Sequence, residues 1–140
     1  MNLKHVSITD DKVVVIYEQE TDNGSADVTF RCSDPPSKKF REAFESCGPA
    51  MSEALGLGDY VAGEEVTKIA IKEGDEKTEF VVTAKHPIED SNRPLNISTP
   101  LLDDEAFPEL GECVKSVMRC ARAYVSGDRA QLLLFGKEAA

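Results

Sequence analysis

The sequence predicts an α+β fold in which an antiparallel sheet of about five strands carries two amphipathic helices on one face, in the order β-β-β-α-β-β-α. A chain of 140 residues with 41% hydrophobic content can bury a sizeable core. Several segments alternate apolar and polar residues between turn residues, as strands do. Two longer segments place apolar residues at helical spacing. The α+β arrangement lets every such strand and helix bury its apolar side.

The first 32 residues predict an antiparallel meander of three strands. Val6 and Ile8 alternate with polar neighbours, and Asp10-Asp11 provides a turn. Residues 13–17 form a β-branched run, which is typical of a buried strand. Asn23-Gly24 indicates a tight hairpin because both residues tolerate a positive φ. Residues 26–32 then alternate as the third strand.

The first helix is predicted to begin at Asp34-Pro35-Pro36, with Asp34 as the capping residue. Its apolar stripe keeps one register beyond Pro49, which falls on the solvent face, so we predict a kinked but unbroken helix. Gly56-Leu57-Gly58 is expected to end it. The stripe consists of Phe40, Ala43, Phe44, Cys47, Met51, Ala54 and Leu55.

The second half of the chain predicts a hairpin, a long loop and a helix. Segments 66–71 and 80–82 flank the turn at residues 74–77. Residues 86–108 are rich in Asp, Asn, Ser, Thr and Pro, which favours a loop with a short extended piece at 95–97. Pro108 opens a helix that Gly127 ends. Its apolar arc contains Leu110, Cys113, Val114, Val117, Met118, Cys120, Ala121, Tyr124 and Val125.

Composition restricts the classes of partner. The 26 acidic and 16 basic residues give a net charge of −10, which disfavours direct binding to nucleic acid. The longest apolar run is too short to span a membrane, and no apolar segment follows the N-terminus as a signal peptide requires. We therefore expect a cytoplasmic protein that contacts no membrane.

The cysteines and histidines predict no catalytic, cofactor or metal site. The four cysteines form no Cys-x-x-Cys pair, and Cys113 and Cys120 would lie about 10 Å apart on one helix, beyond disulfide reach. We expect free, largely structural thiols. His5 and His86 belong to no nucleophile–base motif, although Glu89 and Asp90 follow His86.

Two acidic clusters are the other candidates for a metal site. Gly63-Glu64-Glu65 and Asp103-Asp104-Glu105 lack the spacing of a calcium loop. We expect both clusters to be solvated surface, and we predict that the protein is not an enzyme.

Four apolar side chains run together near the end of the chain, in the segment Gln131-Leu132-Leu133-Leu134-Phe135. Continuing the preceding helix would spread them at steps of about 100°, so a helix could not bury them on one side. We expect residues 1–128 to form one globular domain and residues 129–140 to form a tail. The run is then either a short strand of the domain's own core or an extended peptide for a partner.

These five residues have the form Gln-Leu-x-Leu-Phe, and the segment resembles the peptides by which bacterial proteins bind the DNA polymerase sliding clamp, or β clamp. The resemblance implies that the Gln131 amide forms a hydrogen bond at the rim of a clamp pocket. It also implies that Leu132, Leu134 and Phe135 fill the apolar parts of that pocket. Leu133 departs from the Ser or Asp that is more usual at the middle position.

The resemblance implies an accessory or inhibitory protein, of bacterial or phage type, whose partner is the β subunit of DNA polymerase III. An alternative is an acidic protein that imitates the charge of nucleic acid on a host enzyme, with residues 131–135 as core. A third hypothesis, an enzyme that uses the 86–107 loop, lacks a nucleophile or a metal set.

Overall fold

The structure, a computed structural model, describes residues 1–10, 12–56, 65–88 and 90–127. Within these ranges the chain forms seven strands and two helices, which confirms the predicted α+β class with more strands than expected. The elements are β1 (Asn2–Thr9), β2 (Lys12–Thr21), β3 (Gly24–Cys32), α1 (Lys38–Ala54), β4 (Glu65–Glu73), β5 (Thr78–His86), β6 (Leu95–Ser98), β7 (Leu102–Asp103) and α2 (Pro108–Val125).

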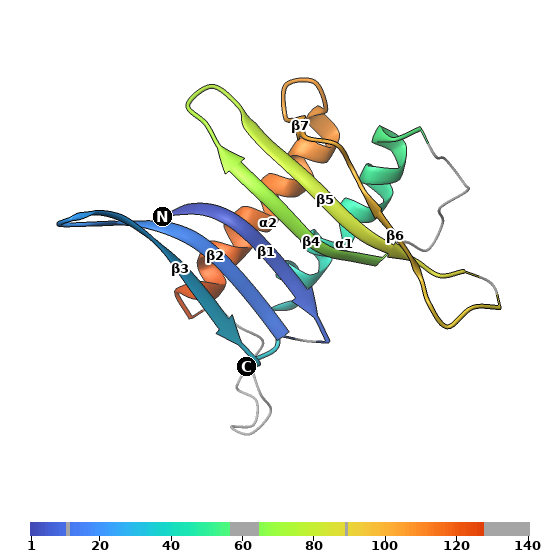
Figure 1. The fold of residues 1–140 in the computed structure, drawn as a ribbon, viewed down its shortest axis with the longest axis horizontal. Helices are drawn as coiled ribbons and strands as arrows, with labels where there is room; N and C mark the ends of the chain where they lie inside the picture. Colours follow the sequence, from blue (N-terminus) through green and yellow to red (C-terminus); the bar gives the residue numbers. More distant parts are fainter. Residues whose placement is uncertain (11, 57–64, 89, 128–140) are drawn as a thin grey trace.

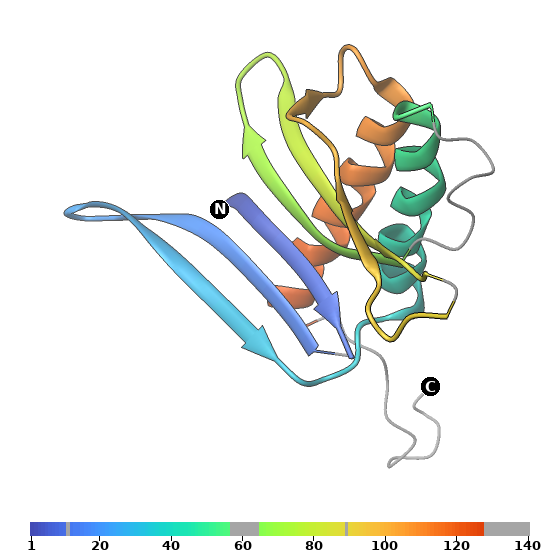
Figure 2. The ribbon, with the colours of Figure 1, turned by 45° about the vertical axis from the view of Figure 1, so that its right-hand side comes forward.

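The strands form one antiparallel sheet in the order β3-β2-β1-β4-β5-β6, and β7 also pairs with β5. Figure 1 shows the order across the sheet. In Figure 2 both helices lie side by side on the same face, as predicted. The outer part of the β2–β3 hairpin extends beyond the helices, and residues 19–27 are exposed there.

The predicted meander is confirmed in its order and in its hairpin at Gly24, while Asp11 of the expected Asp10-Asp11 turn lies outside the described residues. Thr21 pairs with Gly24 across the hairpin, where Gly24 has a φ of +118° that L side chains rarely adopt. Asp10 takes a φ of +51° between β1 and β2. In β2, Val13 and Val15 are fully buried while Val14 is only partly covered, so one face of this strand meets the core.

Helix α1 begins later than the sequence predicts. Its N-cap is Ser37, whose Oγ accepts a hydrogen bond from the Phe40 N–H at 3.2 Å, so the prediction of Asp34 as cap is wrong. The physical reason lies in the two prolines. A residue that precedes proline is disfavoured in the helical region, and Pro35, which would be the first helical residue after an Asp34 cap, precedes Pro36. The segment therefore stays extended until Ser37.

Helix α1 continues unbroken past Pro49, as predicted. Pro49 lies inside the helix on its exposed side, so the missing N–H does not end it. The helix stops at Ala54 with Leu55 as C-cap, and Gly56 follows with a φ of +70°. Leu57 and Gly58 lie outside the described residues.

The segment predicted as a long loop contains two strands. Leu95 pairs with His86, which confirms the expected extended piece, but Leu102 also pairs with Phe80 in the unpredicted strand β7. Thr99 lies between these two strands and is attached to β5. Its Oγ1 accepts a hydrogen bond from the Val82 N–H, and its own N–H donates to the Val82 carbonyl. The polar composition of this segment does not predict that its strands pair with β5, because the pairing depends on β5 and not on the local sequence pattern.

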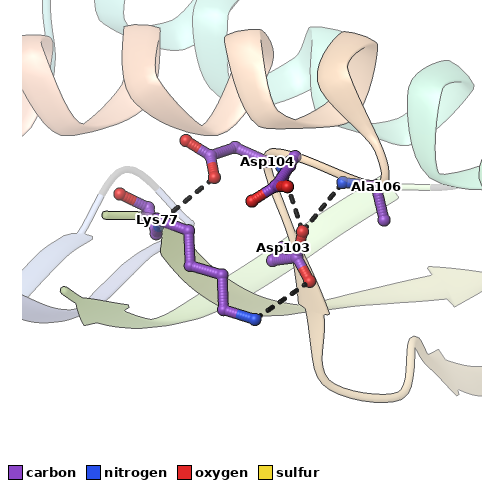
Figure 3. Close-up of polar contacts among 6 residues, drawn as sticks. Lys77, Asp103, Asp104 and Ala106 are labelled. Atoms are coloured by element: carbon purple, nitrogen blue, oxygen red, sulfur yellow. Dashed lines mark hydrogen bonds and ion pairs between the residues drawn. The ribbon is translucent and has the colours of Figure 1, made fainter. Parts of the chain in front are cut away.

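A turn built on two aspartates leads into α2. Asp103 Oδ1 accepts hydrogen bonds from the N–H groups of Ala106 at 2.8 Å and Glu105 at 3.0 Å (Figure 3). Its Oδ2 lies 3.7 Å from Lys77 Nζ, and Asp104 accepts from the Thr78 N–H at 3.1 Å. The aspartates thus join β7 to the start of β5 and fix the approach to Pro108.

The core lies between the helices and one face of the sheet. Helix α2 buries the middle of its predicted arc, while Cys113, Cys120 and Val125 are only partly covered at its margins. Of the described residues, none belongs to a helix long and apolar enough to cross a membrane. The largest fully buried side chains are Tyr124, Phe40, Phe80, Leu3, Met51, Ile69, Leu110, Val6, Val13, Val15, Val82 and Val114.

Candidate functional site

The four predicted partner-binding residues, Gln131, Leu132, Leu134 and Phe135, lie outside the described residues. The description ends at Gly127, four positions before Gln131, so the structure neither brings these side chains together nor separates them. The described residues do define the folded domain that precedes this peptide.

The C-terminal end of α2 is firmly attached to the domain. Tyr124 is fully buried, and its ring makes edge contacts with Phe30 and Phe40 at centroid distances of 6.0 and 5.7 Å. Its hydroxyl donates a hydrogen bond to the Asp34 carbonyl. Gly127, with a φ of +114°, then donates its N–H to the Tyr124 carbonyl. The chain therefore leaves the helix at a fixed point.

An ion pair near the same end connects α2 to the sheet. Arg122 Nη2 lies 2.7 Å from each carboxylate oxygen of Glu73, and Glu73 Oε2 also accepts the Leu3 N–H at 2.6 Å. Such charge-assisted hydrogen bonds are stronger than neutral ones. The Glu73 carboxylate thus holds together β1, β4 and α2.

A groove of about 490 Å³ runs between α1 and α2 and contains thiols. Cys113 and Cys120 line it, together with Lys39, Glu42 and Arg119. None of the four cysteines forms a disulfide, and the prediction of free thiols agrees with that. The prediction did not anticipate that Cys113 meets Cys47 across the helix interface.

The contact between these two sulfurs changes the pKa of both thiols. The hydrogen bond from Cys47 lowers the pKa of Cys113 to about 6, and burial opposes this shift. The same contact, followed by burial, raises the pKa of the Cys47 thiol. Cys113 therefore ionises first and Cys47 keeps its proton. Spacing in the sequence could not reveal the pair, because the two cysteines come from different helices.

The face of the sheet opposite the helices carries a polar hollow of about 720 Å³. His5 and Lys68 lie in it with the hydroxyl pair Thr83 and Ser98, whose oxygens are 2.8 Å apart. Desolvation, with Lys68 adding to it, lowers the pKa of His5, so the ring is neutral at pH 7. The hollow offers hydrogen-bonding groups without a nucleophile–base pair.

The second histidine lies at the end of β5. His86 Nδ1 is buried and has no hydrogen-bond partner among the described residues, which do not include Glu89. No group of three or more His, Cys, Asp or Glu side chains suited to a metal ion occurs in the described part of the chain.

Several carboxylates form ion pairs within the domain. Asp27 pairs with Lys4, Glu65 with Lys85, Asp104 with Lys115, and Glu73 with Arg122. These acids lie on β3, at the two ends of β4 and in the turn before α2, and their partners partly neutralise them. These four carboxylates therefore do not belong to a row of unpaired charges of the kind that imitates a phosphate backbone.

No protein-family model matches the chain, and comparisons with curated proteins and with solved structures likewise find no match.

Proposed function

We propose that this protein binds the bacterial DNA polymerase sliding clamp, the β subunit of DNA polymerase III, through the peptide Gln131-Leu132-Leu133-Leu134-Phe135. The observation that carries the proposal is the match of these residues to the form Gln-Leu-x-Leu-Phe. Gln131 supplies the polar anchor at the rim of the clamp pocket. Leu132, Leu134 and Phe135 supply the apolar anchors.

The folded domain is consistent with a peptide of this kind at its C-terminal side. The hydrophobic core described above is built from residues 3 to 124, and α2 ends at Val125. A peptide that supplies a few anchors to a partner's pockets is a common mode of recognition.

Binding through the tail suits the charge of the protein. With a net charge of −10, the domain is repelled by a phosphate backbone. Attachment to the clamp brings such a protein to DNA without a basic surface of its own. Two roles are compatible with the same peptide. As an accessory protein, the chain is held at replication sites by the clamp. As an inhibitor, it occupies the clamp pocket and excludes the polymerase.

The size of the contact sets the expected affinity. Five residues bury less surface than a standard protein interface, so we expect a Kd in the micromolar range, or about −8 kcal/mol. Removing the Leu134 and Phe135 side chains forfeits about 3 kcal/mol or more of apolar burial. That loss corresponds to at least about a hundredfold in Kd.

The test is to measure binding of the purified full-length chain to immobilised β clamp. We expect the wild type to bind with micromolar Kd and a Leu134→Ala/Phe135→Ala variant to bind at least about a hundredfold more weakly. Leu133→Ala, at the tolerant middle position, is expected to change Kd little. Lys137→Ala/Glu138→Ala is a control with two changes in the tail and an unaltered net charge.

Thermal unfolding of each variant separates loss of binding from loss of fold. If Leu134 and Phe135 were core residues, the double variant would lose several kcal/mol of stability. Equal binding by the wild type and the double variant, or no binding by the wild type, contradicts the proposal.

A further inference from the structure

Two cysteines from different helices meet beside the groove between α1 and α2, which only Cys113 of the two lines. Cys113 Sγ lies 3.8 Å from the carbonyl oxygen of Ser46, which belongs to the peptide unit shared with Cys47. The Cys113 sulfur therefore lies beside the backbone of Cys47. The two thiols are also in hydrogen-bonding contact with each other. In Figure 2 the two helices run side by side, as a cross-link between them requires.

The two sulfurs differ in access to solvent. Cys113 lines the open groove and is partly exposed, whereas Cys47 is fully buried behind it. The Cys47 thiol is also 3.6 Å from the carbonyl oxygen of Ala43. A small reagent in the groove thus reaches Cys113 first, and Cys47 is positioned to react with the product.

Charged groups from both helices surround this site. Lys39 and Glu42 contribute from α1, and Glu112 and Arg119 from α2. Glu109 and Glu112 oppose ionisation of Cys113, but the hydrogen bond from Cys47 outweighs them and leaves the pKa of Cys113 at about 6. A thiolate is the nucleophilic form of cysteine, so Cys113 is in its reactive form at pH 7.

We propose that Cys113 is a site of oxidation by hydroperoxides and that Cys47 converts the oxidised product into a disulfide between α1 and α2. The Cys113 thiolate attacks the O–O bond of hydrogen peroxide, which gives a sulfenic acid and releases hydroxide. The Cys47 sulfur then attacks the Cys113 sulfur, and the sulfenic hydroxyl leaves as water with the Cys47 proton. One peroxide is reduced and two thiols are oxidised. This reaction is independent of clamp binding.

The sequence makes the product simple to detect. Cleavage after Lys and Arg, except before Pro, places Cys32, Cys47, Cys113 and Cys120 in the separate peptides 32–38, 42–68, 86–115 and 120–122. The reduced full-length protein is treated with one equivalent of hydrogen peroxide, blocked with an alkylating reagent and digested without reductant. Mass spectrometry then identifies which peptides are joined.

The expected product is peptide 42–68 joined to peptide 86–115. A Cys47→Ala variant also loses the hydrogen bond that lowers the pKa of Cys113, so we expect its Cys113 to react more slowly and to stop at the sulfenic acid, which dimedone traps. In Cys120→Ser, a control for the other groove cysteine, we expect the same disulfide as in the wild type. The wild-type result is decisive even where a variant folds poorly.

Two results would overturn the proposal. One is oxidation of Cys32 or Cys120 before Cys113 in the folded wild type. The other is oxidation of Cys113 without any link to Cys47. A further check is the rate of Cys113 alkylation by iodoacetamide, whose pH midpoint is expected at about 6. An ordinary thiol has its midpoint at about 8.5.

Discussion

Gly111 is where α2 passes closest to the turn that precedes it. A Cβ at this position would lie 2.7 Å from Asp104 Cβ and 2.9 Å from Asp104 Cα. Real Cβ contacts are essentially never that short, so the Asp104 backbone would have to move. The glycine therefore permits the close approach of the Asp103–Asp104 turn to the helix (Figure 3).

Gly111→Ala is expected to destabilise the protein. The clash should cost up to about 3 kcal/mol, because backbone and not a flexible side chain must yield. Alanine in a helix interior regains about 1 kcal/mol of helix propensity. We expect a net loss of about 2 kcal/mol in the free energy of unfolding, measured by urea titration. An increase in stability, the usual result of Gly→Ala in a helix, would contradict this account.

The cysteines show that sequence spacing predicts burial but not which residues come into contact. The buried position of Cys47 followed from its place in the apolar stripe of α1, and it is confirmed. The contact between Cys47 and Cys113 did not follow, because it depends on how α1 and α2 cross. Helical periodicity predicts which face is buried but not the partner of each residue on it.

Ser37 controls where α1 starts. Its side chain satisfies one of the N–H groups that the first helical turn leaves without an intrahelical partner. Ser37→Ala is expected to lower the free energy of unfolding by about 1 kcal/mol, while Ser37→Asp should keep the cap. Ser46→Ala, on the exposed side of the same helix, is the control and should cost less. Equal losses for Ser37→Ala and Ser37→Asp, measured by thermal melting, would argue against a capping role.

The salt bridge between Asp104 and Lys115 joins the turn before α2 to the helix itself. Asp104 Oδ2 lies 2.7 Å from Lys115 Nζ, and Asp104 Oδ1 accepts the Thr78 N–H. The Lys115 hydrogen bond, helped by the bond from Thr78, holds the pKa of Asp104 below its ordinary value of 3.8. The ionised carboxylate therefore favours the folded state.

This pKa shift has a defined consequence for stability against pH. Because the pKa of Asp104 is lower in the folded state, its contribution is complete only well above the ordinary value of 3.8 and is lost as the pH falls through the folded value. Asp104→Asn keeps an acceptor for Thr78 but removes the charge. Urea unfolding of both proteins should give a constant difference from pH 7 to about pH 5 that shrinks at lower pH. A difference that grows on acidification would contradict the assignment.

Elements with a strong local pattern were predictable, and those that depend on distant partners were not. The hairpin at Gly24, the helix that passes Pro49 and the helix that begins at Pro108 follow from turn chemistry and periodicity, and the structure agrees. Strand β7 has only two residues and exists because Leu102 pairs with Phe80 of β5. The start of α1 was misplaced because Pro35, the first helical residue after an Asp34 cap, itself precedes Pro36 and is disfavoured in the helical region.

For the whole molecule, the described fold and the proposed function rest on different parts of the chain. The described domain shows an ordinary α+β packing of two helices on an antiparallel sheet, and such a fold does not define an activity. The proposed activity rests on residues 131–135, which the sequence alone singles out. The proposed redox site, in contrast, depends on the packing of α1 against α2, which brings Cys47 and Cys113 into contact.

The most direct measurement of the central claim is a competition experiment. Labelled full-length protein is bound to the purified β clamp, and a synthetic peptide of residues 128–140 is added in increasing concentration. If the tail carries the interaction, the peptide displaces the protein completely at micromolar concentration, and the same peptide with Leu134→Ala/Phe135→Ala does not. Full-length protein that stays bound at saturating peptide, or that never binds the clamp, would contradict the claim.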